Sequence, residues 1–378
     1  METLTLECQL LNTEFPNSLH AGAILDGTAY FLGGSGSISN LCRFDFESNT
    51  WPIVDSSENE SRNLQRHHLL AHSSGHLFAW GGCNRSTPAS DYQKLFLAYS
   101  IANKKWIKIN QSGILPLPRA GGAFVVRSSS GSNNSGSNNN SGNKCNSNIS
   151  GNNSNNTISG SGNSQQLSFV CFGGYNGNYM NDMHEFVLNV ESWSGVWRPV
   201  SSNSPPPPRS AVAHAYRATR DSMLVIGGVG SVGPHCEIFE YLCAQERWHE
   251  VTAVDGRQVP SRSGARAALV RDRYVMVFGD AISVPFVMFD LQRSVWSVLE
   301  FSGYDPRERN YPVVLYHQHR CSLLLHGGES CPKYTSGTCP DLCEVMLPFA
   351  HHSTAKFHDK LLEQVTLGQL ADMYFTFK

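Results

Sequence analysis

The segment TAYFLGG at residues 28–34 decides the fold, because close copies of it recur along the chain. The copies are HLFAWGG (76–82), LSFVCFGG (167–174), SMLVIGG (222–228), CSLLLHGG (321–328) and the degenerate YVMVFGD (274–280). Each is a short apolar run, typical of a buried strand, that stops at glycines able to adopt a positive φ. A strand that recurs in this way predicts a repeat protein.

Two further features recur around these copies. A second small or apolar run precedes each copy, and these runs begin at His20, His67, Ala120, Ser210, Gly264 and Tyr311. In five units a tryptophan opens a fourth predicted strand, namely Trp51, Trp106, Trp197, Trp248 and Trp296. Four strands in a unit of roughly 50 residues are typical of one blade of a β-propeller. A single blade cannot bury both its faces, so we expect the blades to pack in a ring.

On these motifs residues 4–349 resemble the kelch-repeat family, whose blades carry a diglycine after the second strand and an aromatic pair further on. The resemblance implies an all-β fold, a six-bladed kelch β-propeller over residues 1–349. The last unit, residues 311–347, has no tryptophan strand, but the N-terminal Leu4, Leu6, Cys8 and Leu10 alternate with polar residues as in a half-buried strand. We expect this N-terminal strand to complete the last blade and close the ring.

Two segments stand apart from the repeats. Residues 128–164 are almost entirely Asn, Ser and Gly, a composition that favours disorder within the third blade, with a flexible recruiting arm as the functional alternative. Residues 350–378 predict a short helical tail, in which Asp372, Met373 and Phe375 resemble the first strand of a BTB domain. That likeness implies a kelch-then-BTB architecture similar to leucine-zipper-like kelch/BTB adaptors. The alternative is a short helix that caps the propeller.

Composition narrows the class of protein. The 378 residues carry 29 basic and 31 acidic side chains, a balance that argues against broad attraction to nucleic acid or anionic membranes. The N-terminus lacks the basic and apolar regions of a secretory signal, and no stretch approaches the roughly 18 apolar residues of a membrane helix. The 11 cysteines are then expected to be reduced thiols. We expect a cytoplasmic protein with no nucleic-acid or membrane partner.

A search for catalytic and metal motifs favours a protein that is not an enzyme. No phosphate-binding glycine loop, HExxH helix or Gly-x-Ser-x-Gly elbow is present. Cys331, Cys339 and Cys343, with His326 or His351, do not follow the paired spacing of zinc ligands, which favours free thiols. His67, His68 and His72 could form a ligand triad in the channel, but successive side chains of a strand alternate between faces, which favours structural histidines. We expect no metal and no cofactor.

Arginine and tyrosine gather at one edge of the predicted ring. Arg66, Arg119, Arg209 and Arg262 each stand just before an inner strand, and Arg309 stands two residues before Tyr311. The predicted partner-binding rim comprises Arg66, Arg85, Arg119, Tyr175, Tyr179, Arg209, His235, Arg262 and Tyr311. Such a composition is typical of protein-binding hot spots, and paired guanidinium nitrogens suit carboxylates. The regular recurrence equally favours a structural role, such as hydrogen bonds between neighbouring blades.

These expectations combine into a non-catalytic interaction propeller. The partner is a protein, with an acidic peptide segment as the natural ligand, and the family resemblance implies that the rim binds degrons. A BTB region following the propeller would bind cullin, which makes the chain the substrate-recognition part of a ubiquitin ligase adaptor. A cytoskeletal or signalling scaffold without a ligase role is the alternative.

Overall fold

The computed structural model describes residues 2–15, 17–35, 40–55, 64–84, 91–127, 166–258, 262–279, 286–330 and 337–348. Within these ranges the chain is almost entirely β-structure, with two short 3-10 turns, η1 (Ala218–Arg220) and η2 (Cys243–Gln245). None of the helices in the described ranges is long and apolar enough to cross a membrane. The predicted insertion, the predicted helical tail with its BTB likeness, and Arg85 lie outside the described residues.

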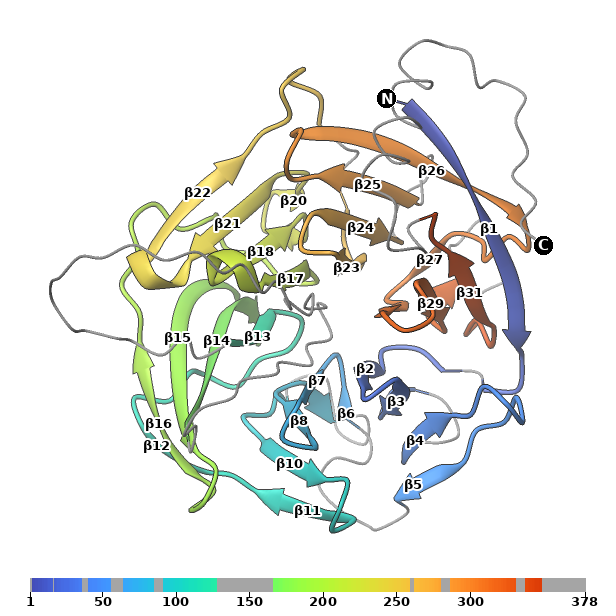
Figure 1. The fold of residues 1–378 in the computed structure, drawn as a ribbon. Helices are drawn as coiled ribbons and strands as arrows, with labels where there is room; N and C mark the ends of the chain where they lie inside the picture. Colours follow the sequence, from blue (N-terminus) through green and yellow to red (C-terminus); the bar gives the residue numbers. More distant parts are fainter. Residues whose placement is uncertain are drawn as a thin grey trace, which may run out of the picture.

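Four sheets each follow the chain outward from an inner strand (Figure 1). The first is β2 (Ala21–Leu25), β3 (Thr28–Leu32), β4 (Leu41–Phe44) and β5 (Ile53–Asp55). The second is β7 (His68–His72), β8 (His76–Trp80), β10 (Phe96–Ser100) and β11 (Lys105–Lys108). The third is β13 (Ala123–Arg127), β14 (Gln166–Tyr175), β15 (Tyr179–Asn189) and β16 (Ser194–Pro199), with β12 (Asn110–Gly113) added in parallel outside β16. The fourth is β17 (Ala213–Arg217), β18 (Ser222–Ile226), β21 (Ile238–Leu242) and β22 (Arg247–Val251).

The remaining long strands form one sheet of eight, because the N-terminal strand joins two repeats. Its order is β23 (Arg266–Val270), β24 (Tyr274–Phe278), β25 (Phe286–Asp290), β26 (Val295–Gly303), β1 (Glu2–Asn12), β31 (Leu342–Met346), β29 (Ser322–His326) and β28 (Val313–His317). Short two-stranded sheets pair β6 (Leu64–Gln65) with β9 (Cys83–Asn84), β19 (Val229–Gly230) with β20 (Gly233–Pro234), and β27 (Arg309–Asn310) with β30 (Glu329–Ser330).

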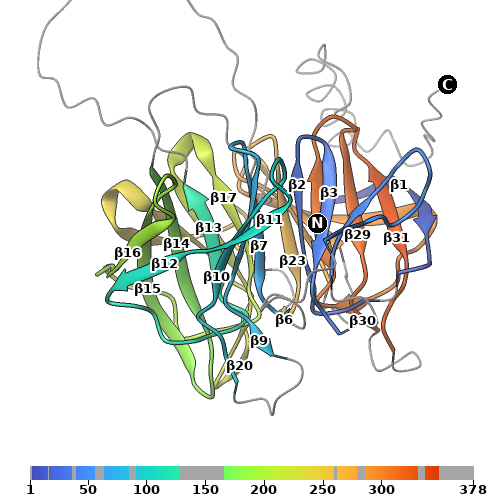
Figure 2. The ribbon, with the colours of Figure 1, turned by 90° about the horizontal axis from the view of Figure 1, so that it is seen from below.

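The sheets are arranged as in a β-propeller. The inner strands β2, β7, β13, β17, β23 and β28 contact one another in turn, and β28 returns to β2. In Figure 1 these strands surround the centre and the outer strands lie at the periphery, and Figure 2 shows the sheets side by side from below. The predicted all-β, propeller-like arrangement is therefore confirmed. Since one sheet spans two repeats, the count of six blades stays a prediction.

The N-terminal strand lies beside the last repeat, as its alternation of apolar residues predicts. β1 pairs in parallel with β26 over residues 2–8, and then antiparallel with β31, where Cys8 faces Val345. Leu6 and Cys8 are buried, but Leu10 is 41% exposed. The expected burial of Leu10 is therefore wrong; the regular pairing with β31 ends at this residue, and the register shifts between Leu10 and Asn12.

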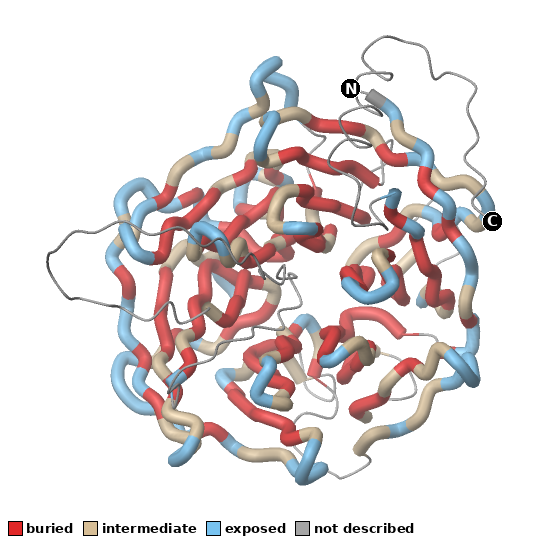
Figure 3. Tube along the Cα trace, viewed as in Figure 1, coloured by how far each residue is buried: buried red, intermediate tan, exposed pale blue. Residues whose placement is uncertain are grey.

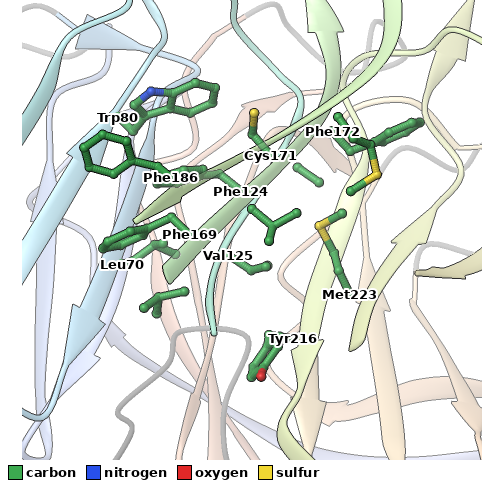
Figure 4. Close-up of a cluster of buried hydrophobic side chains, with 14 of the residues drawn as sticks. Leu70, Trp80, Phe124, Val125, Phe169, Cys171, Phe172, Phe186, Tyr216 and Met223 are labelled. Carbon is green, nitrogen blue, oxygen red and sulfur yellow. The ribbon is translucent and has the colours of Figure 1, made fainter. Parts of the chain in front are cut away.

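Aromatic side chains fill the space between neighbouring sheets. The rings of Trp80 and Phe124 stack at 4.5 Å, although they belong to different sheets, and Phe78 meets Phe169 edge-on at 5.1 Å. Figure 4 shows part of this cluster, which extends from Leu70 to Met223. Figure 3 shows the buried residues on the inner and middle strands and the exposed ones on the outer turns. Burial of this much aromatic surface holds the sheets face to face.

Candidate functional site

Arg119 is enclosed at the end of its repeat, before β13, and is only 1% exposed. Its Nη1 donates a hydrogen bond to the Gly173 carbonyl at 3.0 Å, and Nη1 and Nη2 reach the Asp182 carboxylate at 2.6 and 2.7 Å. Its Nε donates to the Leu117 carbonyl at 2.9 Å. Burial alone would raise the pKa of Asp182, but the hydrogen bonds and charge of Arg119 outweigh it, so that pKa is lowered. The guanidinium thus binds groups of its own repeat.

The same contact recurs in the following repeats. The Nη1 atoms of Arg209, Arg262 and Arg309 donate to the carbonyls of Gly227, Gly279 and Gly327 at 3.0, 2.8 and 3.2 Å. All three arginines are 2% exposed or less. A partner cannot touch guanidinium groups that are enclosed in this way. Arg119, Arg209 and Arg262 are therefore removed from the predicted partner-binding rim, and the structural interpretation of their recurrence is the one that the geometry supports.

The main chain of each such residue binds the preceding repeat. The amides of Gly82, Gly174 and Gly228 donate to the carbonyls of Arg119, Arg209 and Arg262 at 2.9, 2.9 and 2.7 Å. Arg119 and Arg209 therefore each join two neighbouring diglycines, one through the side chain and one through the carbonyl, and Arg262 joins Gly228 to Gly279 of the degenerate copy in the same way. The Gly-Gly pairs that end the five repeated strands adopt positive φ at both residues, as the sequence predicts.

Asn17 takes the place of the arginine in the first repeat. Its Nδ2 donates to the Gly33 carbonyl at 2.8 Å, and its carbonyl accepts from the Gly328 amide of the last repeat at 3.0 Å. This pair of bonds links the two ends of the ring. Sequence reasoning missed Asn17, although Asn17-Ser18-Leu19 precedes its inner strand as Arg209-Ser210-Ala211 precedes the inner strand of a later repeat.

Arg66 differs from the buried arginines, because it stands two residues later in its repeat. Leu64 occupies the arginine position there and accepts the Gly34 amide at 2.8 Å. Arg66 instead matches Tyr311: both directly precede an inner-strand run and adopt left-handed φ of 53° and 52°. Arg66 is exposed, and its guanidinium carbon lies 4.8 Å from the centre of the Tyr311 ring. The structure thus brings together two predicted rim residues from distant repeats.

A second group of predicted rim residues lies on the hairpin of β14 and β15. Tyr175 and Tyr179 pair directly across this hairpin, their rings are 5.0 Å apart, and both are half-buried. The ring of Tyr92, which was not predicted, lies 6.0 Å from that of Tyr175. His235, by contrast, is 9% exposed, and its Nδ1 lies 3.5 Å from Glu237. The three tyrosines form an accessible aromatic group, whereas His235 contributes little surface.

The central channel is lined by basic side chains. A cavity of about 70 Å³ touches the inner strands β2, β7, β17, β23 and β28, and its polar lining consists of His20, His67, His68, His214 and Arg266. Burial lowers the pKa of His67 and of His214 to about 4, so both are neutral near pH 7. Burial also lowers the pKa of Arg266 to about 10. His20, His214 and Arg266 were not predicted, although polar residues within apolar inner-strand runs would have marked them.

The alternative metal sites are not assembled. His72 lies at the far end of β7, where its Nδ1 is 2.9 Å from the Ser74 hydroxyl, so the triad with His67 and His68 does not form. His326 is buried against His20, and Cys331 is outside the described residues. Across the described ranges no group of three His, Cys, Asp or Glu residues is placed to hold a metal ion.

One comparison with known proteins gives a match. The family model described as the KLHDC2/KLHL20/DRC7 Kelch-repeats domain matches residues 134–328. No curated protein matches the chain. The matched region contains three of the five diglycines and the arginines that join them.

Proposed function

The chain belongs to the kelch-repeat family that its residues 134–328 match, and from this membership we propose that it recruits a protein partner through the rim around Arg66 and Tyr311. Kelch propellers are protein–protein interaction modules, and the fold is typically not enzymatic. We place the propeller at residues 1–349, with six blades, and count the eight-stranded sheet as two.

The exposed Arg66 carries the proposal. Its guanidinium lies over the Tyr311 ring at 4.8 Å, and no described carboxylate forms an ion pair with it. An aromatic face holds the guanidinium plane in place while its N–H groups stay accessible. Arginine and tyrosine are the residues that most often dominate binding energy at interfaces. The residues proposed to contact the partner are therefore Arg66, Tyr311, Tyr175, Tyr179 and Tyr92. Arg85, which the sequence analysis placed on the rim, stays in this proposal.

The ligand that suits this set is an acidic peptide segment. A carboxylate pairs with two guanidinium nitrogens at once, and tyrosines provide apolar area beside it. Such a segment fits the degron that a cullin-type ubiquitin ligase adaptor presents to its ligase. We therefore propose that the chain is the substrate-recognition part of a cytoplasmic adaptor, in which a BTB region that begins in residues 350–378 binds cullin.

Proximity labelling with the full-length gene product tests the proposal. Arg66→Glu should reduce capture of the client about ten- to a hundredfold, since one charge-assisted pair contributes about 1.5–3 kcal/mol. Arg43→Glu is the control, because the Arg43 side chain is 43% exposed but lies on β4, where it pairs with Asp45 at 3.5 Å. Cullin among the captured proteins supports the adaptor. Cytoskeletal proteins without cullin support a scaffold instead, and a client that Arg66→Glu captures normally contradicts the rim assignment.

A further inference from the structure

Arg266 is a half-buried cation whose described charged or titratable neighbours are basic or neutral. It lines the central cavity, its Nη1 donates a hydrogen bond to the neighbouring Ala265 carbonyl at 3.0 Å, and its guanidinium carbon lies 5.6 Å from the centre of the Tyr311 ring. Among the described residues, the charges that shift the pKa of Arg266 are those of Arg66 and Tyr311. Arg266 in turn lowers the pKa of His20, His68 and His214. No described carboxylate is among them. Withdrawing a guanidinium even partly from water without an anion is costly, so such a group usually has a negatively charged partner.

The histidines of the cavity wall lack hydrogen-bond partners at specific atoms. Nδ1 of His20, Nε2 of His68 and Nδ1 of His214 are each buried without one. Buried polar atoms in proteins are nearly always paired with protein, water or a ligand. The wall therefore has a cation without a described carboxylate partner and several unpaired imidazole nitrogens around about 70 Å³ of space.

The hydrogen bonds of His326 and His20 determine whether Nδ1 of His20 donates or accepts a hydrogen bond. The Phe15 carbonyl can only accept, so Nε2 of His326, at 3.1 Å, must carry a hydrogen. Burial lowers the pKa of His326 to about 3, so this ring is neutral and its Nδ1 accepts a hydrogen from Nε2 of His20 at 2.8 Å. Burial and the nearby basic groups keep His20 neutral too. Nδ1 of His20 is thus a hydrogen-bond acceptor that needs a donor.

A ligand that satisfies this wall must carry negative charge for Arg266 and an O–H group for His20. Carboxylate and sulfate have no hydrogen to donate near pH 7, whereas hydrogen phosphate has both acceptor oxygens and an O–H. The cavity has room for several water molecules or one tetrahedral oxyanion, but not for a peptide segment. From these observations we propose that the central channel binds a single phosphate group, held by Arg266 and His20.

This ligand is separate from the protein partner of the rim. Its contacts would come from inner strands of several repeats, so bound phosphate would strengthen the ring itself. Anything that binds only the folded state raises the unfolding temperature in proportion to the logarithm of its concentration.

Thermal unfolding of the purified 378-residue chain tests the proposal with inorganic phosphate as the probe. At constant ionic strength and pH 7, phosphate should raise the unfolding temperature by a few degrees, in proportion to the logarithm of its concentration, whereas sulfate and acetate should raise it less. Phosphorus NMR of the same titration should show broadening of the phosphate resonance. Equal shifts with sulfate would overturn the assignment of His20, and the absence of both signals would overturn the site.

Arg266→Gln is the decisive variant. It should abolish the response to phosphate while leaving the phosphate-free protein about as stable as the wild type, because it removes a half-buried charge that has no described carboxylate partner. Arg257→Gln is the matched control, since that side chain is 55% exposed, and it should respond like the wild type. If Arg266→Gln does not fold, His214→Gln replaces it and should weaken the response. A full phosphate response in both variants would overturn the proposal.

Discussion

Replacing Arg119 by alanine should destabilise the propeller, although its position in the sequence suggested a partner contact. The change removes the bidentate pair with Asp182 at 2.6 and 2.7 Å, and it leaves the carbonyls of Gly173 and Leu117 without their donor. The backbone bond from Gly82 to residue 119 can persist, because it uses the main chain. The loss of stability in Arg119→Ala therefore reports on the side-chain hydrogen bonds of Arg119 alone.

The magnitude follows from the burial of the two partners. Breaking a buried, hydrogen-bonded charge pair costs about 3–5 kcal/mol. Arg119 is 1% exposed, but the side chain of Asp182 is 39% exposed, so water can solvate its carboxylate once the arginine is gone. The lower end applies, and we expect Arg119→Ala to lower the free energy of unfolding by about 3 kcal/mol.

Urea unfolding followed by tryptophan fluorescence measures this change. The transition midpoint should fall and its slope should stay the same. Arg209→Ala should cost less, because Arg209 reaches Glu237 at only 3.4 Å. The control Arg257→Ala removes an exposed side chain and should stay within about 0.5 kcal/mol of the wild type. A loss below about 1 kcal/mol for Arg119→Ala would refute the structural interpretation of these arginines.

Three further predictions concern the ring as a whole. Gly82→Ala should lower the free energy of unfolding by at least about 2 kcal/mol, because its φ is 94° and an added Cβ would lie 2.7 Å from the Gln65 carbonyl. Gly75→Ala is the control: its φ is 76° but the space around it is open, so urea unfolding should show a loss of only about 1 kcal/mol. Deleting residues 2–12 should lower the unfolding temperature by calorimetry, because β1 holds both β26 and β31; an unchanged temperature would mean that the strand is dispensable. Stability should be level above pH 6.5 and fall as pH drops toward 4, because His67 and His214 stay neutral in the fold with pKa values of about 4 while the unfolded chain takes up protons; a scan with no loss by pH 5 would contradict their burial.

The repeat made most of the fold predictable. Diglycines and tryptophans at regular spacing indicated the strands, and Trp106, Trp197, Trp248 and Trp296 lie in the outermost strand of their own repeat. The pairing of the N-terminal segment with the last repeat was also predictable, because that repeat lacked an outer strand of its own. The repeat pattern predicts the strands because each repeat packs against its neighbours in the same way.

The candidate site was predicted less well, because exposure depends on single-residue register. Arg66 and Arg119 both stand close to an inner strand, yet an offset of two residues exposes the first and buries the second. A periodic pattern read by eye does not resolve such an offset. The contact between His20 and His326 joins residues that are 306 positions apart, and no local pattern reveals it.

The position of β1 has a consequence for how the chain is made. Gln9 donates a hydrogen bond to Glu344 across a separation of 335 residues, so β1 leaves the ribosome long before either of its partners, β26 and β31, has been made. Until then it is an unpaired apolar edge, the kind of surface that invites aggregation and calls for chaperones. Synthesis of β26, followed by that of the last repeat, therefore sets the earliest moment at which β1 is protected from misassembly.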